Sequence, residues 1–323
     1  MINYPIKFQP ILQEKIWGGN KLRDILNKET EFENVGESWE ISGVKDFISV
    51  VANGSEEGKK LTDLITEYKA DLLGKKIFEQ FGEDFPLLIK FIDAKTDLSV
   101  QLHPNDKLAK ERHNSFGKTE MWYVMQADQG SRLNIGFSKN TNKVEYLDYL
   151  NGGKILDLLN FEEVKKGDSV FINTGKVHAI GGGILLAEIQ QTSDITYRIY
   201  DWDRVDANGN GRELHTDLAL DAIDFEKKDD YKLEYESNAN ESSNIASCEY
   251  FTTNFLPVEG EIVKDYSNLD SFVILMCVDG AAEVEVNGNT ESIVRGQTIL
   301  IPAITETLKI KAEKSELLEV YIK

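Results

Sequence analysis

A chain of 323 residues, with 41% hydrophobic and 28% charged residues, is long enough for two domains and has the composition of a globular protein. Its 36 Lys and Arg against 56 Asp and Glu give a formal net charge of −20, which disfavours nucleic acid and anionic membranes as partners. The two cysteines are too few for a disulfide framework, the start has no signal-peptide pattern, and no run approaches the ~20 apolar residues that cross a bilayer, so we expect a cytoplasmic protein.

The N-terminal segment predicts β-structure. Residues 8–12 have the pattern of a short strand, and the glycines in 17–19 predict a turn after it. In residues 36–43, apolar and polar side chains alternate between glycines, which is typical of a half-exposed strand. We expect residues 49–52 to be its hairpin partner.

Four segments have the apolar spacing of amphipathic helices. They are residues 21–27, residues 62–81 with a break at Gly74, residues 144–159 with a hinge at the Gly152–Gly153 pair, and residues 216–225. We expect these helices to be peripheral to a strand-rich fold.

Two candidate metal ligands share one face of a short strand. Residues 85–93 form a nearly continuous apolar run, which predicts a buried strand that leads through a turn into residues 100–103. Alternation along that segment places Gln101 and His103 on the same side. Pro104 has no N–H for sheet pairing, so we expect the strand to end there.

Two later strand segments supply further side chains of ligand type. An aromatic-rich strand begins at Glu120, and residues 169–172 lead through a turn into His178. With Gln101 and His103 these side chains make a nitrogen and oxygen donor set that suits zinc or another divalent first-row ion.

The alternative interpretation of these residues is structural, because a histidine in a strand is more often a satisfied core or surface residue than a ligand. The chain has only four histidines, and this scarcity favours the metal site. His113 and His215 lie in polar, helix-like surroundings, and we expect both at the surface.

The C-terminal part predicts a second β domain. The longest strand signal, residues 183–191, is followed by a polar segment at 227–241 that has the composition of a surface linker. Residues 296–303 repeat the pattern of residues 167–174, and Thr307 stands where the first copy has His178. We therefore predict a mainly β protein of two domains, each a small antiparallel barrel or jelly roll, with a metal-binding domain and helical insertions in 1–226 and a domain without metal ligands in 227–323.

Several of these motifs resemble those of the type I mannose-6-phosphate isomerases, which are zinc-dependent cupin enzymes. The resemblance covers roughly the first two thirds of the chain, and the short length resembles the compact bacterial branch of the family. It rests on residues 101–106, 117–123 and 177–183, with further matches in residues 17–19, 36–42 and 187–198.

The resemblance implies two cupin domains and one Zn²⁺ per chain, held by Gln101, His103, Glu120 and His178. It also implies that mannose 6-phosphate and fructose 6-phosphate are interconverted through a cis-enediol(ate), with Arg198 close to the reacting carbons.

Further site residues follow from the strand pattern around these motifs. Glu188 lies mid-strand among apolar residues, where its pKa could be raised for proton transfer, or it could pair with Arg198 as a brace. By alternation Lys118 shares the face of Glu120, and Ser99 shares the face of Gln101. With Arg204, where longer members carry a lysine, Lys118 and Ser99 are our candidates for phosphate binding, and Lys118 could instead contact a substrate hydroxyl.

Two other functions stay open at this point, namely a metal-dependent cupin such as an iron dioxygenase, and a non-catalytic sugar-binding cupin. Gln101 as a fourth ligand favours the isomerase, because an oxygenase needs open positions for O₂. As partners we expect a small phosphosugar but no nucleic acid and no membrane, and a monomer or weak homodimer.

Overall fold

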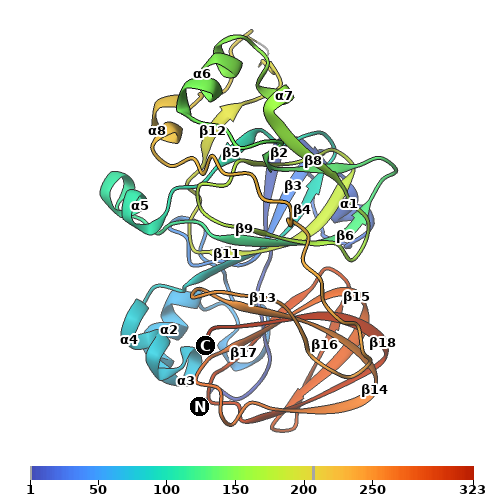
Figure 1. Ribbon diagram of the computed structural model, residues 1–323. Coiled ribbons are helices and arrows are strands. Elements are labelled where there is room, and N and C mark those ends of the chain that lie inside the picture. Colours follow the sequence, from blue (N-terminus) through green and yellow to red (C-terminus); the bar gives the residue numbers. More distant parts are fainter. Residues whose placement is uncertain (1, 206–207) are drawn as a thin grey trace.

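The computed structural model describes residues 2–205 and 208–323 and is mainly β, as predicted (Figure 1). The strands are β1 (Ile6–Lys7), β2 (Ile11–Gly19), β3 (Val35–Ile41), β4 (Leu87–Ala94), β5 (Val100–Leu102), β6 (Glu120–Ala127), β7 (Arg132–Phe137), β8 (Leu159–Glu163), β9 (Ser169–Ile172), β10 (His178–Ile180), β11 (Ile184–Gln191), β12 (Tyr197–Tyr200), β13 (Ser243–Ser247), β14 (Thr252–Asp265), β15 (Val273–Val286), β16 (Asn289–Val294), β17 (Thr298–Ile301) and β18 (Thr307–Tyr321). The helices are α1 (Lys21–Asp24), α2 (Leu61–Tyr68), α3 (Ala70–Leu73), α4 (Lys75–Phe81), α5 (Asp106–His113), α6 (Lys143–Asn151), α7 (Ile155–Leu158) and α8 (Thr216–Leu220), with a 3₁₀ turn at Gly54–Glu56.

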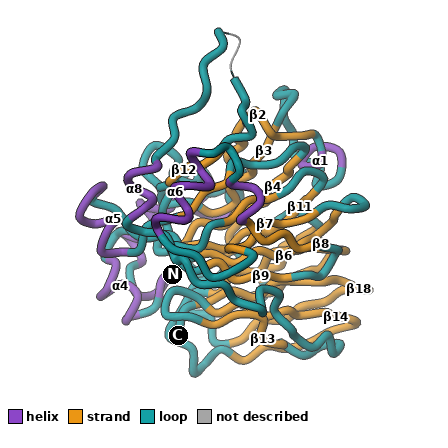
Figure 2. Tube along the Cα trace, turned by 45° about the horizontal axis from the view of Figure 1, so that its top comes forward, coloured by secondary structure: helices purple, strands orange, loops and turns teal. Residues whose placement is uncertain are grey.

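The described strands form three antiparallel sheets in two units (Figure 1). The N-terminal unit contains a six-stranded sheet, in the order β2-β3-β4-β11-β6-β9, and a five-stranded sheet, in the order β12-β5-β10-β7-β8. The C-terminal unit contains the order β1-β17-β15-β18-β14-β13, with β16 paired to β15. In Figure 2 the helices α4, α5, α6 and α8 lie along one side of the stacked strands.

The N-terminal end of the chain is built into the C-terminal unit. Strand β1 pairs with β17, and the carbonyls of Asp71 and Leu72 in α3 accept hydrogen bonds from Ile304 and Ala303. Helices α2 to α4 lie beside the C-terminal strands in Figure 1. The division of the chain at residues 226/227 stays a prediction. These contacts show that residues on both sides of this boundary contribute to the C-terminal unit.

The six-stranded sheet has an apolar core on one face and the inside of the N-terminal unit on the other, and its strand β11 contributes side chains to both. All residues of β11 are buried, and alternate side chains point to opposite faces. One face carries Leu185, Ala187 and Ile189, which belong to an apolar core shared with the C-terminal strands β14, β15 and β18. Glu188 and Gln190 have the opposite parity and therefore face the inside of the N-terminal unit.

Several predicted elements are confirmed. The break at Gly74 separates α3 from α4, and this residue has a φ of 95°, which a side chain rarely adopts. The hinge at Gly152–Gly153 lies between α6 and α7. The predicted helices at 21–27 and 216–225 form over only four and five residues, respectively.

Two local predictions are wrong. Residues 17–19 are not a turn, because β2 continues through Gly19 and Gly18 pairs with Ala94 of β4. Residues 49–52 are not the hairpin partner of β3, since β2 and β4 occupy both of its edges. Val50 and Val51 instead make isolated bridges with Lys60 and Phe8.

The internal repeat is visible in the backbone. Strands β9 and β17 each follow a glycine with positive φ, 91° at Gly167 and 86° at Gly296. After the next turn His178 begins β10, and Thr307 begins β18.

The described part of the chain has no helix that is long and apolar enough to span a membrane.

Candidate metal centre and active-site cavity

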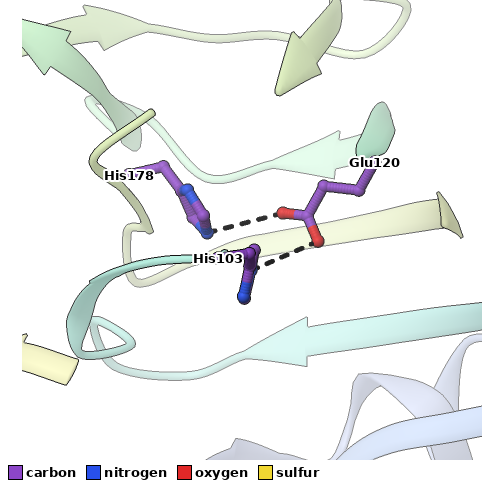
Figure 3. A group of neighbouring side chains, drawn as sticks. All are labelled: His103, Glu120 and His178. Atoms are coloured by element: carbon purple, nitrogen blue, oxygen red, sulfur yellow. Dashed lines mark ion pairs between the residues drawn. The ribbon is translucent and has the colours of Figure 1, made fainter. Parts of the chain in front are cut away.

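Three of the predicted ligands meet inside the N-terminal unit (Figure 3). Glu120 begins β6, His178 begins β10, and His103 directly follows β5. Their donor atoms all lie within 4.8 Å of one another, and the three residues are at most 1% exposed. The Nε2 atoms of His103 and His178 each lie 3.5 Å from a different oxygen of Glu120.

The hydrogen bonds of the two histidines orient both rings toward this centre. Nδ1 of His103 pairs with the carbonyl of Ile195 at 2.7 Å, and Nδ1 of His178 pairs with that of Lys176 at 2.8 Å. With each Nδ1 protonated for this bond, each Nε2 keeps a lone pair. Burial lowers the pKa of His178 to about 3 and that of His103 well below its usual range, so both rings are neutral.

The donor set fits a small divalent ion. In the described residues, His178 Nε2 and Glu120 Oε1 are buried without a hydrogen-bond partner, which is costly unless another group satisfies them. Ligand bonds of about 2.0–2.2 Å in a tetrahedral zinc site place neighbouring donors about 3.3–3.6 Å apart. The two distances of 3.5 Å agree with this spacing.

Gln101 lies beside the centre, on the neighbouring strand. It is paired with His178 across β5 and β10, and it lines the same cavity. Its Oε1 accepts a hydrogen bond from Ser99 Oγ at 3.2 Å, which confirms that the two side chains share a face. An amide oxygen next to three ligands is a suitable further donor for a divalent ion.

A cavity of about 480 Å³ lies between the two sheets of the N-terminal unit and reaches this centre. This volume is in the usual range for small-molecule sites. Although the protein is strongly acidic, more cations than anions line the cavity. The charged residues that line it are Lys15, Lys90, Lys118, Arg198, Arg212, Glu37, Glu188 and Asp194.

Arg198 is fixed at one wall of the cavity, opposite Gln101 in the pairing of β12 with β5. Its backbone N–H donates to His215 Nδ1 at 3.0 Å, and its carbonyl accepts from the N–H of His215 at 2.7 Å. Its guanidinium donates to Ser99 Oγ and to the carbonyl of Glu213. Burial and the neighbouring charge of Arg212 disfavour the charged form of Arg198 and lower its pKa. An anion bound beside the two guanidinium groups would offset this repulsion and would itself be stabilised.

Glu188 does not have the surroundings that the sequence suggested. It accepts a hydrogen bond from Trp122 Nε1 at 2.9 Å and pairs with Lys90 at 3.1 Å, rather than with Arg198. Burial alone would raise the pKa of Glu188, but the ammonium groups of Lys118 and Lys90 lower it. The predicted raised pKa is therefore wrong, and the brace is made with Lys90.

Lys118 lies at the metal end of the cavity. Its Nζ is 2.6 Å from Glu120 Oε2 and 3.2 Å from His103 Nε2. Burial raises the pKa of Glu120, and Lys118 opposes this effect by pairing with the carboxylate. Lys118 is therefore placed to contact oxygens of a ligand next to the metal centre.

The structure places Arg204 outside this cavity and Arg212 on its wall. Arg204 donates to Asp201 and to the carbonyl of Asp97, and these contacts hold its guanidinium away from the lining. Arg212 is held by Asp201 through two hydrogen bonds of 2.7 and 2.6 Å. Sequence reasoning missed Arg212, because it follows Asp201 by eleven residues and no local pattern connects the two.

The other two histidines differ from each other. His113 is exposed, as predicted, while its Nε2 pairs with the hydroxyl of Tyr197 at 2.9 Å. His215 is half-buried, and its Nδ1 also accepts a hydrogen bond from the backbone N–H of Arg198.

Comparisons with known proteins place these features in a family context. Residues 6–130 match the model of the phosphomannose isomerase type I catalytic domain, and residues 241–322 match that of the mannose-6-phosphate isomerase cupin domain. The chain is 33% identical over 303 residues to a mannose-6-phosphate isomerase of Streptococcus mutans, and 32% identical over 305 residues to mannose-6-phosphate isomerase ManA of Bacillus subtilis. These alignments cover 92% and 94% of both chains, respectively.

Solved structures agree with the sequence comparisons. The fold superposes on the crystal structure of a mannose 6-phosphate isomerase from Bacillus subtilis with a TM-score of 0.89 and 33% sequence identity. That match covers 99% of this chain and 100% of the other. A phosphomannose isomerase from Salmonella typhimurium, at 17% identity and a TM-score of 0.80, has the same fold.

Proposed function

Since the chain belongs to the type I mannose-6-phosphate isomerase family, we propose that it interconverts mannose 6-phosphate and fructose 6-phosphate in the cavity around His103, Glu120 and His178. The observation that carries this proposal is the buried donor set at one end of a cation-lined cavity. An aldose–ketose isomerisation needs a base that carries a proton between the two reacting carbons and electrophilic groups for the oxygens on these carbons, and an anionic substrate needs cations. The cavity offers the electrophilic groups and the cations.

The proposed metal is one Zn²⁺ per chain, held by His103, Glu120, His178 and Gln101. Neutral rings, a buried carboxylate and an adjacent amide oxygen support this assignment. When bound, zinc would polarise the substrate oxygens at the two reacting carbons without any redox chemistry.

The positively charged side chains of the cavity would contact different parts of the substrate. Arg198 stabilises the negative charge of the enediolate, because its guanidinium is permanently charged and fixed next to the strand of Gln101. Lys118 donates to a substrate hydroxyl at the metal end. Arg212 binds the phosphate, in place of Arg204, and Ser99 connects Arg198 to Gln101.

Glu188 acts through its neighbours in this scheme. A carboxylate with a lowered pKa is a weak base, so we assign it the positioning of Lys90 and Trp122 in the cavity wall. Lys90 in turn lies over the ring of Trp39 at 5.0 Å, which extends the supported wall.

The family comparisons support the isomerase over an iron-dependent dioxygenase or a non-catalytic sugar-binding protein. We further propose that the enzyme acts in the cytoplasm, where its two free cysteines would stay reduced. The expected monomer or weak homodimer stays a prediction.

The test is an assay of fructose 6-phosphate formed from mannose 6-phosphate by zinc-loaded protein. We expect turnover that a chelator abolishes and that added zinc restores. Oxygen consumption with iron, or tight sugar-phosphate binding without turnover, would each contradict the proposed function.

A further inference from the structure

The segment before β6 is held at three consecutive backbone N–H groups. Gly117, Lys118 and Thr119 precede the first strand residue, Glu120, and are not part of the sheet. Each N–H donates to a different acceptor. These acceptors are Asp106 Oδ1 at 2.8 Å, the carbonyl of Pro104 at 3.3 Å and Gln191 Oε1 at 2.8 Å, respectively.

This segment matters because it carries two side chains of the metal centre. Lys118 and Glu120 both start from it, and the Nζ of Lys118 is 2.6 Å from the carboxylate of Glu120. Ligand geometry tolerates little displacement, since groups that orient the ligands are usually needed for full metal affinity. The acceptors of the segment are therefore candidates for positioning residues.

Asp106 is the central acceptor. Its Oδ1 accepts from the N–H of Gly117 and from Nε2 of Gln191 at 3.1 Å, so it fixes both ends of the segment. Its Oδ2 accepts from the hydroxyl of Tyr250 at 2.5 Å. Hydrogen bonds to a carboxylate are stronger than those between neutral groups.

The backbone of Asp106 lies close to Gly117 of this segment. A side chain at Gly117 would place its Cβ 2.7 Å from the backbone N of Asp106. The absence of a side chain at this glycine therefore permits the short bond to the carboxylate.

Tyr250 belongs to the C-terminal unit. It lies in the turn between β13 and β14, 144 residues after Asp106 in sequence. Burial and the adjacent carboxylate of Asp106 raise the pKa of Tyr250, so its hydroxyl stays protonated and donates. The contact thus runs from the C-terminal unit, through one carboxylate, to the backbone beside the metal ligands.

We propose that Asp106 and Tyr250 are positioning residues, by which the C-terminal unit holds Lys118 and Glu120 in place for metal binding and turnover. The turnover part rests on the proposed function, while the metal-binding part is measured without substrate. This gives the metal-free C-terminal unit a role in the chemistry of the other unit.

The competing explanation is that Tyr250 only helps the two units to dock. The apolar core that they share already joins them, and Lys166 adds ion pairs to Asp279 and Glu316. Lys166 lies in the turn before β9, so Lys166→Met removes a polar contact between the units without touching the segment before β6. It is the matched control.

The experiment compares four variants of the full chain, Tyr250→Phe, Asp106→Ala, Asp106→Asn and Lys166→Met. Zinc affinity is measured by competition with a chromogenic chelator, kcat and KM with mannose 6-phosphate, and folding by thermal unfolding. Asp106→Ala should weaken zinc binding and lower kcat by about 10- to 100-fold, while Tyr250→Phe should have a smaller effect in the same direction. Asp106→Asn keeps an acceptor oxygen and should restore most of both quantities, and KM should stay near the wild-type value throughout.

The results separate the two explanations. Equal losses of zinc affinity in Lys166→Met and Tyr250→Phe would overturn the proposal in favour of general docking. Wild-type zinc affinity and kcat in folded Tyr250→Phe and Asp106→Ala would also overturn it. If Asp106→Ala does not fold, Tyr250→Phe, which removes a single oxygen, decides. Weakened zinc binding in Tyr250→Phe alongside a wild type without isomerase activity would support the positioning role and contradict only the proposed function.

Discussion

His178 lies directly opposite Gln101 in the antiparallel pairing of β10 with β5, and Gln101 lies opposite Arg198 on β12. Three neighbouring strands therefore present a proposed metal ligand, an amide and a guanidinium in one row. Adjacent strands are about 4.8 Å apart, so the row spans about 10 Å between its outer backbones. A phosphorylated sugar could contact the metal centre and the arginines at the same time.

His178 is buried and is one of the proposed zinc ligands, so His178→Ala should lose bound zinc and isomerase activity together. Zinc content by atomic absorption and turnover of mannose 6-phosphate measure the two losses. His113→Ala, a change at an exposed histidine, is the control and should keep both. Activity that survives the loss of zinc would contradict the metal's proposed role.

Arg198 should affect turnover without affecting the metal. Arg198→Ala removes the cation proposed to stabilise the enediolate, and the loss of one such donor typically lowers kcat by about 100- to 1000-fold. The zinc content of the purified variant should equal that of the wild type. Near-normal kcat in this variant would show that another group stabilises the intermediate.

The two neighbours of Asp201 should differ in their effect on substrate binding. Arg212 lines the cavity and Arg204 does not, although both pair with Asp201. Arg212→Met should therefore raise KM for mannose 6-phosphate about tenfold or more, which is the effect of losing at least one charge-assisted hydrogen bond. Arg204→Met should change KM by less than twofold. A larger increase of KM in Arg204→Met than in Arg212→Met would instead assign phosphate binding to Arg204.

The stability of the C-terminal unit should depend on pH through Glu319. This carboxylate is 1% exposed and lies 2.9 Å from the Nζ of Lys264, with a further hydrogen bond from the hydroxyl of Tyr266. Burial alone would raise the pKa of Glu319, but Lys264 and Tyr266 lower it. A folded-state pKa below the unfolded value means that the stabilisation is complete above about pH 4.5 and is lost as pH falls through the folded pKa.

Glu319→Gln should therefore be less stable than the wild type at neutral pH, and the difference should shrink as the pH falls below about 4.5. Urea unfolding at a series of pH values measures the free energy of unfolding of both proteins. Glu313→Gln, at an exposed position of the same strand, should follow the wild-type curve. A constant difference across the acid range would contradict the role of this charge.

The residues that sequence reasoning brought together are those that a local pattern or a family motif identifies. Two-residue alternation placed Gln101 and His103 on one face, while Glu120 and His178 were found at the starts of strand-like segments and through the family motifs. Residues whose role depends on distant contacts were assigned wrongly or missed. Lys90 pairs with Glu188 only because β4 and β11 are neighbours, and this adjacency has no local signal.

The same limit applies to the hairpin expected at residues 49–52. Its local pattern was that of a strand, but β4, some forty residues later, takes the available edge of β3. Sheet edges are shared among all strands of a fold, so an isolated pattern cannot decide which pairs form. For Tyr250 and Asp106 the separation is 144 residues, and only the packing of the two units brings them together.

The central claim is that one zinc ion is bound by residues of three separate strand regions in an active isomerase. Anomalous diffraction on either side of the zinc absorption edge, from crystals of protein that turns over mannose 6-phosphate, tests it directly. We predict one peak per chain, within about 2.0–2.2 Å of His103 Nε2, His178 Nε2 and a carboxylate oxygen of Glu120. A peak elsewhere, or no peak in crystals of fully active protein, would contradict the claim.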